Sequence, residues 1–173
     1  MSEQQGNTEI NLEELYQTYT SDQQIKDSFE RRTVPTGKYV FSAMRASARL
    51  ANEKSPFPGR KMGSFFGSLK DHEGKRRGSV GFDASWEVLK KPNGKMDGPS
   101  VLWGQLVTAL GMKGSNVAEV ITAAGQYPLN VYVAEAFRTP QGWVTARTPE
   151  ERAELRQKNY EARNFVNSVS KAS

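Results

Sequence analysis

The arrangement of apolar and polar residues indicates strands in three stretches of the first half of the chain, residues 38–50, 60–70 and 79–89, although both faces of the first stretch carry apolar residues. The third stretch is the clearest, and its apolar residues all fall on one side: Val80, Phe82, Ala84, Trp86 and Val88. Successive side chains of a strand point to opposite faces, so the pattern predicts three β-strands, the third of them half-buried and antiparallel.

The spacing of apolar residues changes in the second half of the chain. In residues 100–110 and 115–124 they recur three and four positions apart, and a glycine follows each stretch. This spacing predicts two helices, since glycine commonly ends a helix. Residues 128–138 alternate again, and a Thr-Pro-Gln-Gly turn leads to residues 143–147, which predicts a hairpin.

The two ends of the chain are expected to lie outside this domain. Residues 1–33 form an acidic extension, in which Asn11 and Glu14 have the spacing of a capping box and predict a short helix. Near the other end, Thr148 and Pro149 have the residue types of a helix N-cap and first helical position. We therefore expect residues 148–173 to form a polar helix and tail.

The predicted order in residues 34–147 is three strands, a helical region and two strands. This is the order of the OB-fold, a five-stranded Greek-key barrel with its helix between the third and fourth strands. The sequence thus predicts an α+β protein with a five-stranded OB-like antiparallel barrel, an inserted helix, and N- and C-terminal helical extensions. A barrel of the SH3 type fits less well, because it usually lacks the inserted helix.

Charge is distributed unevenly along the chain, although the net charge is only +5. Residues 1–30 carry seven Asp/Glu and one Lys, whereas residues 31–95 carry fifteen Lys/Arg and five Asp/Glu. A basic region of this kind is typical of a protein that binds a polyanion. The simpler alternative is a solvated basic surface with no specific partner.

Residues suited to catalysis or metal binding are scarce. The chain has no cysteine, and its one histidine, His72, lies in a basic turn. The acidic residues show no ligand spacing, and the glycines do not follow a strand into a helix as a nucleotide loop requires. We expect no enzyme activity, no metal and no cofactor. No apolar run approaches the ~20 residues of a membrane span.

The basic residues of the predicted strands and turns are the candidates for phosphate contacts: Lys38, Arg45, Arg49, Arg60, Lys61, Arg76, Arg77, Lys90 and Lys91. Single strands also stack their bases on exposed aromatic rings. Phe82, Trp86 and Trp103 lie on apolar faces and are expected in the core. Phe65, Tyr132 and Trp143 are the predicted stacking residues, and Phe65 is preferred over Phe66 because it shares a strand face with Lys61.

The predicted strands and the first predicted helix contain the segments PTGKYVFSAMRA, PGRKMGSFF, SVLWGQLVTALGM and PLNVYVAEAFRTPQGW. The layout of these four segments resembles that of phage-encoded single-stranded-DNA-binding proteins of the recombination and replication type. The resemblance covers about residues 34–147, and the chain ends in NFVNSVSKAS where bacterial-type members have a flexible acidic tail. It implies an OB-fold that binds single strands without strong sequence preference and has no catalytic activity. It also implies a cytoplasmic location in a bacterial host and contacts with replication or recombination proteins.

Two other functions remain open from the sequence. The same basic patch could bind an acidic protein surface in a structural or accessory phage protein, with the terminal helices building an oligomer. RNA binding is the second alternative, because phosphate contacts and base stacking serve both nucleic acids.

Overall fold

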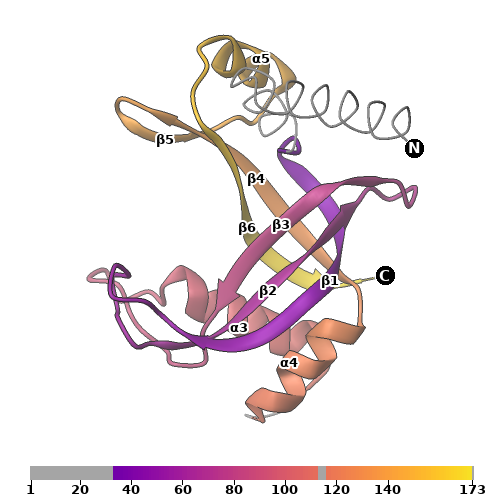
Figure 1. Ribbon diagram of the computed structural model, residues 1–173, viewed down its shortest axis with the longest axis vertical. Helices are drawn as coiled ribbons and strands as arrows, with labels where there is room; N and C mark the ends of the chain where they lie inside the picture. Colours follow the sequence, from indigo (N-terminus) through magenta and orange to yellow (C-terminus); the bar gives the residue numbers. More distant parts are fainter. Residues whose placement is uncertain (1–32, 113–115, 173) are drawn as a thin grey trace, which may run out of the picture. The chain divides into compact units, whose positions relative to one another are not determined.

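The computed structural model describes residues 33–112 and 116–172 (Figure 1). The described residues from Val34 onward form one compact unit. The helix expected near Asn11 lies outside the described residues. The elements of the described part are, in chain order, β1 (Gly37–Leu50), β2 (Lys61–Lys70), β3 (Arg76–Ala84), α3 (Gly98–Ala109), α4 (Val117–Gln126), β4 (Leu129–Thr139), β5 (Gly142–Thr145), α5 (Pro149–Gln157) and β6 (Ala162–Lys171).

The strands form a six-stranded antiparallel sheet, so the chain is an α+β protein. The hydrogen-bonded order is β3-β2-β1-β4-β5, and β6 also pairs with β4. The sheet is strongly curved, and β3 and β6 lie near each other (Figure 1). Among the described strands no ladder joins these two, so the sheet is not a closed barrel.

The inner side of the curved sheet is packed with apolar side chains that alternate along the strands. Phe82 of β3 contacts Phe41 of β1 and Phe65 of β2, at ring-centroid distances of 5.4 and 5.1 Å. Val131 and Val133 of β4 are buried in the same core. Such aromatic and β-branched residues favour strands because they pack well on a pleated, half-buried surface.

A bulge interrupts the register of β1 with β2 between Ala43 and Arg45, beside a close approach of the two backbones at Gly67. A Cβ added to Gly67 of β2 would lie 2.2 Å from the carbonyl oxygen of Ser42. Only glycine can occupy this position without moving the strands apart. The bulge and Gly67 therefore allow β1 to curve and to pair with β2 and β4 along different parts of its length.

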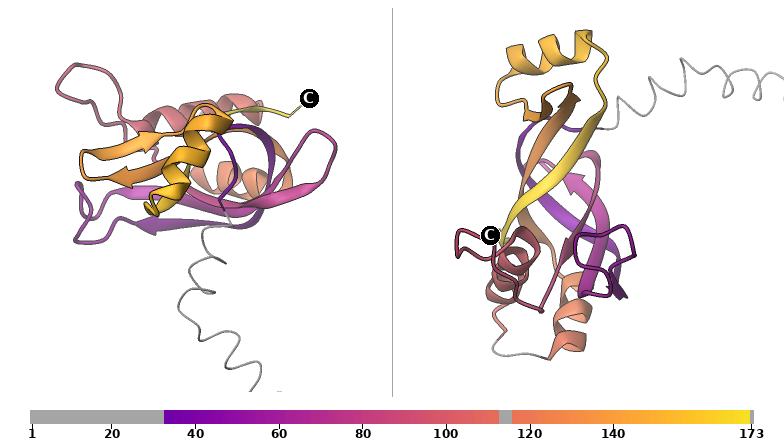
Figure 2. Two further views of the ribbon diagram at one scale, coloured as in Figure 1. Left: turned by 90° about the horizontal axis from the view of Figure 1, so that it is seen from above. Right: turned by 90° about the vertical axis from the view of Figure 1, so that its left-hand side faces the viewer.

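Two helices cover the inner side of the sheet at one end, as the apolar spacing predicted (Figure 2). Asp97 caps α3 by accepting a hydrogen bond from the backbone N–H of Ser100, and Asn116 caps α4 in the same way through Glu119. The helices bury Leu102 and Leu106 of α3 and Val120 of α4. None of the described helices is long and apolar enough to cross a membrane.

The prediction for the C-terminal segment was wrong after residue 157. The helix ends at Gln157, Asn159 adopts a left-handed backbone conformation (φ 57°), and the chain returns as strand β6. This strand buries Val166 and Val169 against the core. The polar residues between these valines hid the strand, because a bulge in β6 breaks their regular alternation.

The start and the end of the unit are joined by one side chain. Asn164 of β6 accepts a hydrogen bond from the backbone N–H of Val34 at 2.9 Å and donates one to its carbonyl at 2.8 Å. At the same end of the unit, the buried carboxylate of Glu135 pairs with Arg152 of α5 at 2.5 Å. These contacts attach α5 and β6 to the sheet.

Candidate nucleic-acid interface

The outward side of β1, β2 and β3 carries basic and small polar residues and one aromatic ring. The strand register aligns them in rows: Arg45 lies opposite Phe66, and Phe66 lies opposite Gly81. We call this surface the cationic face and define it by Lys38, Ser42, Arg45, Ser47, Arg49, Ser64, Phe66, Ser68, Lys70, Arg76, Ser79, Gly81 and Asp83.

Phe66 is the half-buried aromatic ring of this face. The guanidinium of Arg45 lies 5.2 Å from the ring centroid, a cation–π contact. On the other side stands Gly81, where an added Cβ would come within 3.6 Å of the ring. The ring also lies between the small side chains of Ser64 and Ser68 along the outer side of β2. It can therefore receive a flat apolar group such as a nucleobase.

Arg49 and Asp83 form an exposed ion pair at the edge of the cationic face. Asp83 accepts two hydrogen bonds from the guanidinium of Arg49, at 2.6 and 3.3 Å. This bond to the carboxylate raises the pKa of Arg49, so the arginine stays charged. A phosphate that contacts Arg49 must compete with Asp83 for its donors.

The opposite part of the face ends in a group of cations. Lys70 lies opposite Arg76, and Arg77 is the extra residue where the β2–β3 register shifts; all three are exposed. Lys38 of β1 lies opposite Tyr132 of β4, and both side chains are exposed. The structure thus places Lys38, Arg45, Arg49, Arg76 and Tyr132 on one continuous side of the sheet, with Arg77 at its margin.

The expectation that Phe65 stacks on bases was wrong. Its side chain is 1% exposed and stacks on Phe82 in the core. It faces inward with Leu69, and an added Cβ at Gly63 would lie 2.8 Å from its ring. Lys61 misled the prediction because it lies at the first residue of the strand, at the margin of the core. The pairing of Phe65 with Leu69, four residues on, is the sequence signal that identifies Phe66 as the outward ring.

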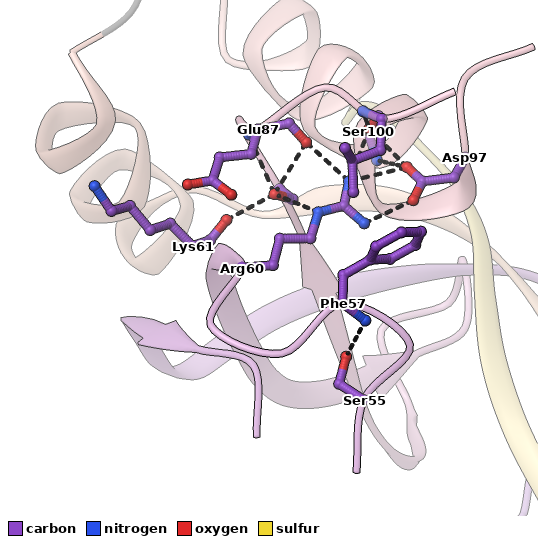
Figure 3. Close-up of polar contacts among 9 residues, drawn as sticks. Ser55, Phe57, Arg60, Lys61, Glu87, Asp97 and Ser100 are labelled. Atoms are coloured by element: carbon purple, nitrogen blue, oxygen red, sulfur yellow. Dashed lines mark hydrogen bonds and ion pairs between the residues drawn. The ribbon is translucent and has the colours of Figure 1, made fainter. Parts of the chain in front are cut away.

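Arg60 was also assigned wrongly, because its side chain is 4% exposed and is surrounded by polar partners (Figure 3). Its guanidinium donates to both carboxylate oxygens of Asp97, at 2.6 and 3.0 Å, and to the hydroxyls of Ser85 and Ser100. The hydrogen bond from Arg60 lowers the pKa of Asp97 to about 2. Arg60 joins the β1–β2 loop to the start of α3 and cannot reach a phosphate.

The remaining predicted cations do not join the cationic face. Lys61 lies opposite Leu50 at the far end of the β1–β2 ladder, and Lys90 and Lys91 lie in the loop between β3 and α3. All three are exposed. Trp143 is 44% exposed on β5 and packs edge-on against Phe165 of β6.

One exposed ring escaped the sequence prediction. Phe57, in the β1–β2 loop, is exposed and lies 5.7 Å from the guanidinium of Arg60 (Figure 3). Its position between Pro56 and Pro58 was the available signal, since prolines mark a loop, and loops lie on the surface.

Comparisons with protein-family models, with curated proteins and with solved structures find no match. The resemblance to phage single-stranded-DNA-binding proteins therefore remains a prediction. Within the part of the chain that the structure describes, no group of three or more acidic, histidine or cysteine side chains could hold a metal ion.

Proposed function

We propose that the protein binds single-stranded DNA through the cationic face without strong sequence preference and without catalysing a reaction. The observation that carries this proposal is the row formed by Arg45, Phe66 and Gly81, which puts an accessible ring beside a guanidinium at the centre of a basic sheet surface. Single strands need both groups, because bases stack on rings and phosphates pair with cations.

The proposal includes an OB-like fold for the sheet. β1, β2, β3, β4 and β6 lie in the order β3-β2-β1-β4-β6, with α3 and α4 between β3 and β4. The OB-fold has this arrangement and is partly open, so the gap between β3 and β6 is compatible with it. The β5 hairpin and α5 are then an insertion between the last two strands. OB-folds bind oligonucleotides on the face of their second and third strands, where Phe66 and Gly81 lie here.

A role in phage DNA replication or recombination, in the cytoplasm of a bacterial host, belongs to the same proposal. The strand would be protected from nucleases and presented to replication or recombination proteins. RNA is the alternative ligand, and an acidic protein surface is the alternative partner of the cationic face.

The test is a fluorescence-anisotropy titration of labelled single-stranded DNA, the matching duplex and the matching RNA, from ~50 to ~300 mM salt. We expect a clear preference for single strands, and log K against log salt with a slope of about −0.7 for each phosphate neutralised. Arg45→Ala should weaken binding and make the slope shallower. Lys91→Ala removes the same charge from an exposed loop residue outside the cationic face and should change neither.

Equal, weak binding to single strands and duplex that disappears near physiological salt would contradict the proposal. The same is true if Arg45→Ala and Lys91→Ala weaken binding equally, because the surface would then act only through its total charge. If the matching RNA binds more tightly than the DNA, the proposed ligand of the cationic face becomes RNA.

A further inference from the structure

A second exposed aromatic group lies outside the cationic face. Trp143 of β5 and Phe165 of β6 meet edge to face, with ring centroids 5.5 Å apart and interplanar angle 81°. Their side chains are 44% and 41% exposed. The guanidinium of Arg163 lies 5.7 Å from the tryptophan ring. We call Trp143, Phe165 and Arg163 the aromatic cluster.

The aromatic cluster is built across β4, which pairs with β5 and with β6. Phe165 lies opposite Ala134, and Trp143 lies opposite Arg138. Ala134 and Ala136 project on this side of β4, and their small side chains leave room for the two rings to meet. Glu161 accepts a hydrogen bond from Arg163 at 2.9 Å and holds it in place. The rings are therefore held from both sides of β4.

The cluster continues the cationic face around the sheet. β4 alternates without a bulge of its own, so Tyr132 and Arg138 point to the same side. Tyr132 lies opposite Lys38, which belongs to the cationic face. Arg45 lies seven positions after Lys38 in β1, and Arg138 lies six positions after Tyr132 in β4, about 20 Å in each case. A path of about 40 Å along the outer side of β1 and β4 thus joins Phe66 to the aromatic cluster, with Lys38 and Tyr132 between them.

We propose that the aromatic cluster is a second base-stacking site for the same DNA strand, a hypothesis that rests on the proposed function. A strand bound at Phe66 would pass Lys38 and Tyr132 and reach Trp143 only when it is long enough. A nucleic acid fits the cluster better than an apolar protein surface does, because a guanidinium lies against the tryptophan ring and exposed Arg138 lies opposite it. Guanidinium and ring together match the phosphates and bases of a single strand.

The experiment compares binding of homothymidine oligonucleotides of about 4, 8, 12 and 16 nucleotides, the range of site sizes of single OB-folds. We expect Trp143→Ala to bind the shortest oligonucleotide as the wild type does and the longest at least about fivefold more weakly. Phe66→Ala should be weakened at every length. Val144→Ala is the matched control, since Val144 is as exposed as Trp143 but points to the other side of β5.

Tryptophan fluorescence gives a second readout that an indirect structural effect would not produce. The other two tryptophans, Trp86 and Trp103, are partly buried and pack against each other at 5.2 Å. Quenching should therefore come from Trp143, and only with the longer oligonucleotides. Trp143→Phe should keep most of the affinity and lose the quenching. Circular dichroism of each variant verifies that it is folded.

If Trp143→Ala binds every length as the wild type does, while Phe66→Ala is weakened, the second site is refuted and the proposed function stands. The same conclusion follows if Trp143→Ala is weakened equally at all lengths. If the wild type binds none of the oligonucleotides, both proposals fail, and the aromatic cluster is better explained by a protein partner.

Discussion

Among the described residues, two pairs of arginine and phenylalanine have similar geometry and opposite exposure. In the cationic face, exposed Arg45 lies 5.2 Å from the half-buried ring of Phe66. In the β1–β2 loop, buried Arg60 lies 5.7 Å from the exposed ring of Phe57. The difference is in the other partners of the guanidinium, because Asp97, Ser85 and Ser100 surround Arg60 (Figure 3). A cation–π contact alone therefore does not show whether an arginine stabilises the fold or binds a ligand.

The largest expected effect is a difference in stability between variants of the two arginines. Arg60→Met should lower the free energy of unfolding by about 3 kcal/mol, because it leaves the carboxylate of Asp97 without its cation in a largely buried place. Arg45→Met should change it by less than about 0.5 kcal/mol, as is usual for an exposed residue. Urea unfolding followed by circular dichroism measures both. If both variants lose the same free energy of unfolding, the burial of the arginine does not determine how much each pair stabilises the fold.

The pH dependence of stability tests the same network through Asp97. Its pKa is about 2 in the folded protein, against an ordinary value of 3.8. The unfolded chain thus binds a proton more readily, and the stabilisation is fully present above about pH 4 and disappears as the pH falls towards 2. The difference corresponds to roughly 2 kcal/mol. Asp97→Asn should lack this part of the acid dependence in urea titrations, whereas Asp83→Asn should retain it.

The two rings should differ in binding. Phe66→Ala should weaken single-stranded DNA binding by about 1–3 kcal/mol, the usual effect of removing a stacking ring. Phe57→Ala should mainly lower stability by about 0.5–1 kcal/mol, because it removes the cation–π contact to Arg60. Anisotropy and urea unfolding of both variants provide the comparison. A larger loss of affinity in Phe57→Ala would move the binding surface to the β1–β2 loop.

The smallest expected effect concerns the exposed pair of Arg49 and Asp83. Asp83→Asn removes the carboxylate that occupies the guanidinium and should tighten DNA binding by up to about 1 kcal/mol at low salt. The gain should shrink as salt rises, since exposed charges are screened. Glu73→Gln removes the same charge from an exposed turn residue outside the face and serves as the control. Weaker binding by Asp83→Asn would mean that Asp83 orients Arg49 for the phosphate.

Much of the fold could be predicted from local sequence patterns. The errors occurred where contacts between residues far apart in the sequence determine the structure. Side-chain alternation identified β1, β2 and β4, and apolar spacing and a following glycine identified α3 and α4, because each of these elements buries one of its sides. β6 was missed because a bulge in its register with β4 separates its valines and breaks their alternation. The third strand was predicted to reach residue 89 but ends at Ala84, where Ser85 turns to bind Arg60.

The basic charge of the candidate site could be predicted from the sequence. The individual residues that form the site could be predicted only in part. Lys38, Arg45 and Arg49 follow from the alternation of β1, although the bulge shifts the outward side from even to odd positions. Arg60 could not be distinguished from them, because its burial depends on Asp97, far along the chain. Phe65 and Phe66 differ only in which side of β2 faces the core, and the small residues around Phe66 became evident only from the cross-strand register.

The contact between Asn164 and Val34 joins residues that are 130 positions apart. β6 is the last strand of the described chain, and β4 has no other partner along the edge where β6 pairs. During synthesis, one edge of β4 therefore stays unpaired until residues 162–171 have left the ribosome. Contacts of such high sequence separation slow folding, and an unpaired strand edge invites association between nascent chains. Because β6 is synthesised after the other strands of this unit, its pairing with β4 is the step that covers the exposed edge and protects the chain from aggregation.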